Sequence, residues 1–277
     1  MPSRHYVATT NRQYAVALAR AFAGATIFCL PLLMTMEMWW LGFTLHPLRL
    51  LQLSLANMVL LFGLSQIAGF EESHSHLDDV LDALAAYGVA AITVTAILWL
   101  VGAIGPDMPL SEVAGKIAIQ AVPASFGAMI GAKLMGEGDR IERQEHWRRT
   151  YPGQLFLMLA GALFLSFTVA PTEEITLIAC QMSPWHSLAM IALSVLLLHS
   201  ILYLVGFRGQ DRRSGKNPRF VFVRQTLPGY AIAIAASLYI LWSLGRTDGL
   251  DLAQVAMAVV VLGFPATIGA GIARIVV

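Results

Sequence analysis

The stretch GQLFLMLAGALFLSFTVAPTEEITLI, residues 153–178, carries only two charged side chains, Glu173 and Glu174, and both stand near its end. It is long enough for a helix to cross a hydrocarbon core roughly 30 Å thick. Apolar runs of similar length recur along the chain, and we expect eight membrane spans. These cover about 15–40, 47–70, 80–104, 111–135, 153–178, 184–207, 220–245 and 251–275. The sequence therefore predicts an all-α, polytopic membrane protein.

The composition of the whole chain agrees with this prediction. Of 277 residues, 57% are hydrophobic and 13% are charged, and the mean hydropathy is +0.67. Soluble domains carry about 25% charged residues, so we expect the lipid bilayer to be the main surroundings of the chain. A net charge of +1 without a basic face argues against a nucleic-acid partner.

The basic residues are distributed unevenly between the two sides of the membrane. With eight spans, both termini and three connections fall on one side, which holds 15 of the 18 Lys and Arg residues. The other side has only Arg49, Lys116 and Arg246. Because Lys and Arg collect in cytoplasmic loops, we expect both termini in the cytoplasm.

The two halves of the sequence repeat each other. With a shift of 137 residues, AGA at 23–25 falls on AGA at 160–162; past the next connection the shift is 142, and PASFGA at 123–128 falls on PATIGA at 265–270. Each copy has four spans, which is an even number, so we expect parallel repeats related by a pseudo-twofold axis along the membrane normal. The predicted domains are a cytoplasmic tail at 1–11, a four-helix repeat at 12–135, a basic cytoplasmic linker at 136–152 and a second four-helix repeat at 153–277.

Carboxylates recur at matching positions of the two copies. Glu37 and Glu174 both stand late in the first span of their copy, and Glu173 is adjacent. An acidic side chain in an apolar span is costly and is typical of a proton, ion or substrate path. We expect these carboxylates, with Thr35 and Thr172, to form a cation site near the outer side of the axis.

The same segments also have a structural interpretation. The carboxylates would then cap helix ends at the water interface or bond to backbone groups freed by Pro171. Such a segment would be a broken helix or an interfacial turn. We favour the functional interpretation because the apolar run continues past both Glu37 and Glu174.

A second repeated element, Pro-Ala-[Ser/Thr]-x-Gly-Ala, lies in the fourth span of each copy. It combines a helix breaker with residues small enough for backbones to approach closely. We expect close helix packing, with the two elements meeting near the centre of the protein; lining a pathway is the alternative. The residues concerned are Pro123, Ser125 and Gly127 in the first copy, and Pro265, Thr267 and Gly269 in the second.

The connection EESHSHLDD at 71–79 gathers four carboxylates and two imidazoles. His74, His76, Asp78 and Asp79 form a candidate site for a divalent cation or for pH sensing. A solvated acidic turn that pairs with the basic connections on the same side is the favoured interpretation.

Motifs for cofactors and for catalysis are missing from the sequence. His199 is the only histidine well inside a span, which excludes a pair of axial haem ligands at depth. We find no HExxH pair, no GxSxG elbow and no phosphate-binding glycine loop. Cys29 and Cys180 are too few for a disulfide framework. We therefore expect no cofactor and no enzymatic activity.

Two segments carry a resemblance to a known family. TMEMWWLG at 35–42 and APTEEI at 170–175 resemble segments of a group of bacterial integral membrane proteins of unassigned function. The resemblance covers nearly the whole chain. It implies a multi-pass protein of the bacterial inner membrane and carries no activity with it.

These observations predict a membrane transport protein that moves a small cation, as a channel rather than as a carrier because parallel repeats favour a central path. Two other classes stay open. One is a sensor that uses the connection at 71–79, or a scaffold for a partner. The other is a lipid-handling membrane enzyme, for which His186 near the carboxylates is the only indication. The oligomeric state is open, a homo-oligomer included.

Overall fold

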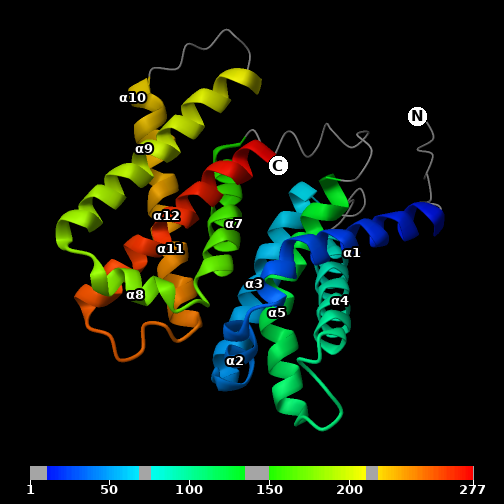
Figure 1. Cartoon of the computed structure of the whole chain (residues 1–277). Helices are drawn as coiled ribbons and strands as arrows, with labels where there is room; N and C mark the ends of the chain where they lie inside the picture. Colours follow the sequence, from blue (N-terminus) through cyan, green and yellow to red (C-terminus); the bar gives the residue numbers. More distant parts are fainter. Residues whose placement is uncertain (1–10, 69–75, 135–149, 210–217, 277) are drawn as a thin grey trace, which may run out of the picture.

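The structure, a computed structural model, describes residues 11–68, 76–134, 150–209 and 218–276. Within these ranges the chain is helical and contains no strand (Figure 1). Eight of the helical segments are long and apolar enough to cross a membrane. The prediction of an all-α polytopic protein is confirmed.

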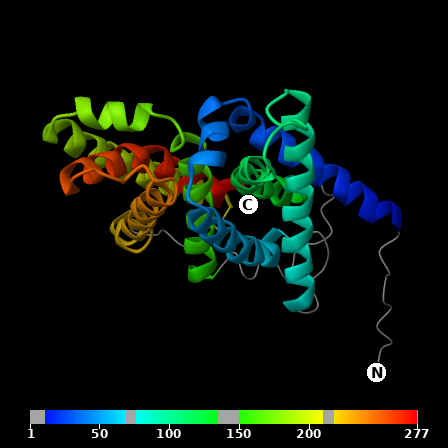
Figure 2. The same cartoon turned by 90° about the horizontal axis from the view of Figure 1, so that it is seen from below.

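The helices divide into two halves, which Figure 2 shows side by side. The first half contains α1 (Asn11–Leu33), α2 (Met36–Thr44), α3 (Pro47–Ala68), α4 (His76–Leu100) and α5 (Leu110–Leu134). The second half contains α7 (Tyr151–Val169), α8 (Glu174–Gln181), α9 (Pro184–Gly209), α10 (Pro218–Val221), the π-helix η1 (Phe222–Thr226), α11 (Leu227–Ser243) and α12 (Leu252–Val276). The segments α10, η1 and α11 follow one another without a gap and form one span.

The first span expected in each half is broken near its end. Helix α1 ends at Leu33 and α7 ends at Val169, and the short helices α2 and α8 follow. The hydroxyl of Thr35 donates to the carbonyl of Leu32 at 2.9 Å, and that of Thr172 donates to the carbonyl of Val169 at 2.9 Å. These bonds satisfy carbonyl groups that have no partner inside the helix. Matching threonines therefore end matching helices.

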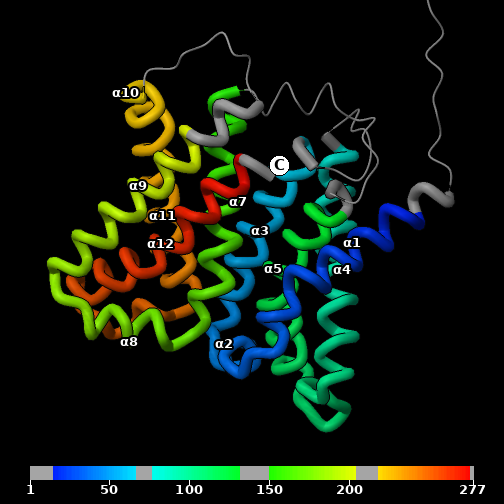
Figure 3. Tube along the Cα trace, turned by 45° about the horizontal axis from the view of Figure 1, so that its top comes forward, coloured from blue at the N-terminus to red at the C-terminus, as the bar shows by residue number. Residues whose placement is uncertain are grey.

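Helices α2 and α8 have 9 and 8 residues, which is too short to cross a membrane. Both lie at the same end of the molecule (Figures 1 and 3). The expected spans at 15–40 and 153–178 are therefore shorter than predicted, at Ala15–Leu33 and Tyr151–Val169. The remainder of each predicted span forms a separate helix at this end.

Each half is built around its last helix. Helix α5 packs against α1, α2, α3 and α4, and α12 packs against α7, α8, α9 and α11. Helices α5 and α12, which carry the repeated Pro-Ala-[Ser/Thr]-x-Gly-Ala element, were expected to meet near the centre of the protein. Instead, their small residues are used in the close approach of α5 to α1 and of α12 to α7, and within the described ranges α5 and α12 do not pack extensively against each other.

Glycine pairs make this close approach possible. A Cβ atom on Gly24 of α1 would overlap the carbonyl oxygen of Gly127 and lie 2.6 Å from the Cα of Gly131. A Cβ atom on Gly161 of α7 would likewise overlap the carbonyl oxygen of Gly269. Because each pair brings backbone against backbone, no larger residue fits without moving a helix.

The same principle positions α2. A Cβ atom on Gly42 would lie 2.6 Å from the Cα of Lys116, and one on Gly115 would overlap the carbonyl of Gly42. The buried Lys116 side chain is bound by Glu112 at 2.6 Å and by the carbonyl of Ala103 at 3.0 Å. Helix α2 is thereby fixed against the start of α5.

Fewer contacts join the two halves to each other. The ring of Phe164 in α7 lies 5.5 Å from that of Phe28 and 6.2 Å from that of Phe126, measured between centroids. Between α3 and α11, Gln52 donates a hydrogen bond of 2.8 Å to the hydroxyl of Tyr239. Sequence-matched glycines make matching contacts in the two halves, while their relation by a pseudo-twofold axis stays a prediction.

We predict that Gly24→Ala and Gly161→Ala each destabilise the protein by about 1–3 kcal/mol, the usual cost of overpacking a tight interior. Gly88→Ala is the matched control, because a Cβ atom there has no neighbour within 4 Å. Alanine also loses less backbone entropy on folding than a helical glycine does, so this variant should not be destabilised. The measurement is reversible unfolding in mixed micelles. Unchanged stability in both test variants would refute the glycine contacts.

Candidate functional site

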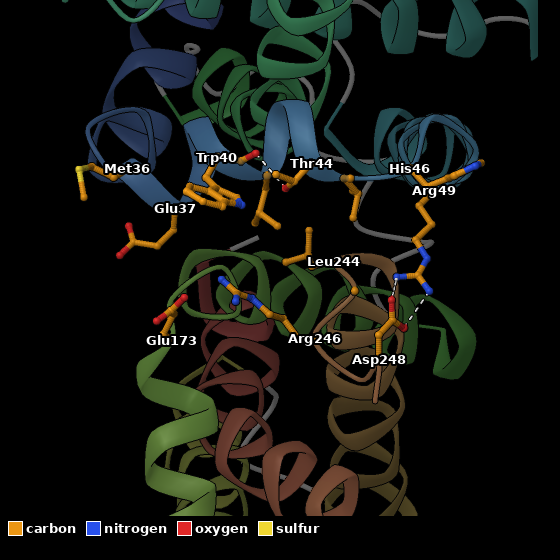
Figure 4. A pocket seen from close by; sticks show the side chains of 13 residues that line it. Met36, Glu37, Trp40, Thr44, His46, Arg49, Glu173, Leu244, Arg246 and Asp248 are labelled. Carbon is orange, nitrogen blue, oxygen red and sulfur yellow. Dashed lines mark hydrogen bonds and ion pairs between the residues drawn. The ribbon is translucent and has the colours of Figure 1, made fainter. Parts of the chain in front are cut away.

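A pocket of about 750 Å³ lies between the two halves, at the end that carries α2 (Figure 4). The first half contributes residues of α2 and the start of α3, and the second half contributes the segment before α8 and the turn after α11. The lining residues are Met36, Glu37, Trp40, Leu41, Thr44, Leu45, His46, Arg49, Glu173, Leu244, Gly245, Arg246 and Asp248. The pocket therefore depends on both halves.

Two of the predicted cation ligands line this pocket, one from each half. Glu37 is half-buried in the first turn of α2, where a carboxylate is favoured by the helix dipole. Glu173 is exposed and immediately precedes α8. Figure 4 shows both side chains on the same side of the pocket, with Arg246 beside Glu173.

Glu174, the sequence match of Glu37, is not among the lining residues. Helix α2 begins at Met36, whose match is Glu173, whereas α8 begins one residue later at Glu174. The two short helices thus begin at positions that do not match in the repeat. The pair brought to the pocket is therefore Glu37 with Glu173.

Glu174 has a local role at the start of α8. Its pKa is lowered chiefly because its own backbone N–H donates to the carboxylate, and the positive charge of Arg246 adds to the effect. The side chain is exposed. This arrangement agrees with the alternative in which Glu174 caps a helix end at the water interface.

Arg246 brings a positive charge into the pocket. Its guanidinium donates to the carbonyl of Pro171, the residue that interrupts the fifth predicted span. Its Nε is buried and finds no hydrogen-bond partner among the residues that the structure describes. From the sequence, Arg246 was identified only as one of three basic residues on the outer side. Its role in the pocket was missed, because no local sequence signal connects this residue with Pro171.

A second arginine in the pocket is neutralised by an ion pair between the halves. Arg49 of α3 donates two hydrogen bonds to Asp248, at 2.7 and 2.9 Å, and lies 5.8 Å from the ring centroid of Trp242. Hydrogen bonding to Arg49 lowers the pKa of Asp248. Gly245 permits the close approach, since it has a φ of +73° and a Cβ atom there would lie 2.9 Å from Arg49.

The charges of the pocket are therefore mixed but acidic on balance. Arg49 and Asp248 offset each other, and Glu37 and Glu173 then outnumber Arg246. A small cation is favoured in such a space over an anion. Thr35 and Thr172 hold the helix ends and do not line the pocket.

The repeated Pro-Ala-[Ser/Thr]-x-Gly-Ala elements lie inside the two halves, away from the pocket lining. In α5, Ser125 donates to the carbonyl of Val122 and accepts a 2.9 Å hydrogen bond from Asn57. In α12, Thr267 donates to the carbonyl of Gly263 at 2.6 Å. Pro123 and Pro265 are within their helices, and Gly127 and Gly269 form the crossings described above.

The predicted metal site near the other end is only partly described. His74 lies outside the described residues, His76 begins α4, and Asp78 and Asp79 stand in its first turn. The described residues contain no group of three or more His, Cys, Asp or Glu side chains that could hold a metal ion. The site at 71–79 stays a prediction.

His186, the one indication of an enzyme, also lies apart from the pocket lining. His186 stands in the first turn of α9, and its Nδ1 is 2.9 Å from the hydroxyl of Ser183, which precedes the helix. His46 is the histidine that lines the pocket.

The fold and this pocket define a multi-pass helical membrane protein with a mixed-charge pocket between two helical halves. The chain belongs to the DUF2391 family of integral membrane proteins, whose model matches residues 17–277. The resemblance found in the sequence is thereby confirmed. Comparison with curated proteins and with solved structures gave no match.

We predict a measurable coupling between Arg49 and Asp248 in a double-mutant cycle with Arg49→Gln and Asp248→Asn. For an exposed pair it should amount to about 0.2–1 kcal/mol at neutral pH. Because the pKa of Asp248 is lowered in the folded protein, the coupling is complete above the ordinary aspartate pKa and is lost as pH falls through the lowered value.

Unfolding in mixed micelles at several pH values measures this coupling. Asp251→Asn is the control, since Asp251 accepts a hydrogen bond from the backbone N–H of Gln254 and asparagine retains that ability. Additive effects of the two substitutions at neutral pH would show that the ion pair does not join the halves.

Proposed function

We propose that this protein moves a small cation across the membrane and that the cation first binds in the pocket between the halves. The observation that carries the proposal is the convergence of Glu37 and Glu173, from different halves, on one acidic pocket. Carboxylates at the mouth of a path attract cations and repel anions. With no nucleotide-binding motif in the chain, movement would be passive or coupled to another ion gradient.

Arg246 sets the strength of binding in this proposal. Transport requires binding that is favourable enough for entry and weak enough for release. The guanidinium, held by the carbonyl of Pro171, offsets part of the charge of Glu37 and Glu173. A cation in the pocket therefore shares the carboxylates with a resident positive charge, and its affinity stays moderate.

The proposal includes the features of organisation expected from the sequence. The two halves are parallel repeats, the path follows their pseudo-twofold axis, and a channel is favoured over a carrier. Both termini are cytoplasmic, the pocket opens outward, and the membrane is the bacterial inner membrane.

We predict that Glu37→Gln and Glu173→Gln each reduce cation flux into liposomes that contain the purified protein. Glutamine keeps the size and polarity of the side chain and removes its charge. The double substitution should reduce flux by less than the product of the single effects, since both carboxylates act on the same ion. The measurement is flux with different cations inside the liposomes.

Asp251→Asn is the matched control, because Asp251 is an exposed carboxylate outside the pocket lining. It should leave flux close to that of the unmodified protein. Equal flux in the unmodified protein, both single variants and the double variant would show that Glu37 and Glu173 do not form a cation site. Absence of flux for every cation would instead favour a sensor or scaffold.

The orientation is tested by labelling single cysteines in intact cells with an impermeant thiol reagent. The variants are made in a Cys180→Ser background. Asp107 is exposed in the connection from α4 to α5, so a cysteine introduced by Asp107→Cys should react with the reagent from outside. Ser214→Cys, in a basic connection on the opposite side, should react only after permeabilisation. The reverse pattern would place the termini outside and turn the pocket inward.

A further inference from the structure

A π-turn directs two polar side chains into the second half. The backbone N–H of Leu227 donates to the carbonyl of Phe222, five residues earlier, which is the bond of a π-helix. The consecutive residues Gln225 and Thr226 are both buried there. Thr226 lies 3.0 Å from Nδ1 of His199, which ties the turn to α9. Such turns occur frequently at functional sites.

Gln225 holds a half-buried arginine. Nη1 of Arg274, near the end of α12, donates to Oε1 of Gln225 at 2.6 Å, and Nη2 donates to Oε1 of Gln154 in α7 at 3.1 Å. Both acceptors are neutral amides, and Arg274 forms no ion pair within the described part of the chain. A partly buried charge without a counter-charge is costly, and none of the described residues gives this guanidinium an anionic partner.

A second arginine reaches the same turn of α7. Arg224 precedes Gln225, and its guanidinium carbon lies 5.2 Å from the ring centroid of Tyr151. Tyr151 and Gln154 are three residues apart in α7 and share one face of the helix. In the described ranges the contacts of Arg224 are with aromatic rings and involve neither a hydrogen bond nor an ion pair.

We propose that Arg274, Arg224, Gln154 and Gln225, termed here the arginine cluster, bind a phosphate group. Arginine carries five N–H donors that suit phosphate oxygens, and the bonds to Gln154 and Gln225 use only two of those of Arg274. The cluster lies where α7 begins and α12 ends, the level at which spans leave the hydrocarbon and lipid headgroups are found. An anionic lipid headgroup and free phosphate offer the same chemistry.

The cluster belongs to the second half alone. The sequence positions that match Gln154 and Arg274 in the first half are Ala17 and Ala132. A purely structural role shared by both copies would retain a polar pair in the first half as well. The proposal is independent of the cation pocket, which lies at the other end of the helices.

The test uses the purified full-length protein in detergent with three probes: phosphatidylglycerol, zwitterionic phosphatidylcholine and inorganic phosphate. Native mass spectrometry counts bound lipid, and thermal unfolding with added inorganic phosphate measures binding of the free ion. We expect phosphatidylglycerol to bind in preference to phosphatidylcholine. Arg274→Gln should weaken this binding about tenfold and Arg224→Gln about fivefold, since each removes one positive charge at the phosphate.

Arg20→Gln in α1 is the control, because it removes a positive charge from the first half. If inorganic phosphate stabilises the protein in an Arg274-dependent way while both lipids bind equally, free phosphate is the ligand and the site stands. If neither probe distinguishes Arg274→Gln or Arg224→Gln from the unmodified protein, the proposal is wrong. Should Arg274→Gln fail to fold, the exposed Arg224 decides, and unchanged binding in Arg224→Gln overturns the site.

Discussion

Backbone contact between glycines is the constraint on which the rest of this structure depends. Inside a bilayer, apolar side chains gain little by leaving lipid for protein, and helices associate where small residues let their backbones meet. Gly24 with Gly127 and Gly161 with Gly269 provide such contacts. They place α5 and α12 at the centres of the halves, and the approach of Gly42 to Gly115 then brings α2 and Glu37 to the wall of the pocket.

The membrane character of the fold could be predicted because it follows from local composition. Apolar runs of sufficient length identified eight spans, and a helix is the structure that satisfies the backbone of a single segment in lipid. The breaks after Leu33 and Val169 were harder to locate, since apolar residues continue through Met38 and Ile175. The side-chain bonds of Thr35 and Thr172 that end these helices carry no signal in hydropathy.

The candidate site could be predicted only in part, because its charges come together from distant parts of the chain. Acidic residues are rare in apolar segments of the sequence, and this rarity indicated Glu37 and Glu173 as candidate cation ligands. Arg49 and Asp248 are 199 residues apart and form their ion pair only when α3 lies beside α11. Sequence repetition also suggested Glu174 as the partner of Glu37, but α2 and α8 begin at positions that differ by one residue, and Glu173 is the carboxylate that lines the pocket.

The main helix pairs of the two halves are α1 with α5 and α7 with α12. In each pair the two helices are far apart in the chain, so the ribosome makes them at different times. Residues 34–109 lie between the end of α1 and the start of α5, and residues 170–251 lie between the end of α7 and the start of α12. At roughly 5–20 residues per second, a ribosome needs roughly 4–16 s to complete either interval. During that time the exposed backbone at Gly24, and later at Gly161, faces lipid or the insertion machinery without its partner helix. Assembly of each half therefore waits for its last span.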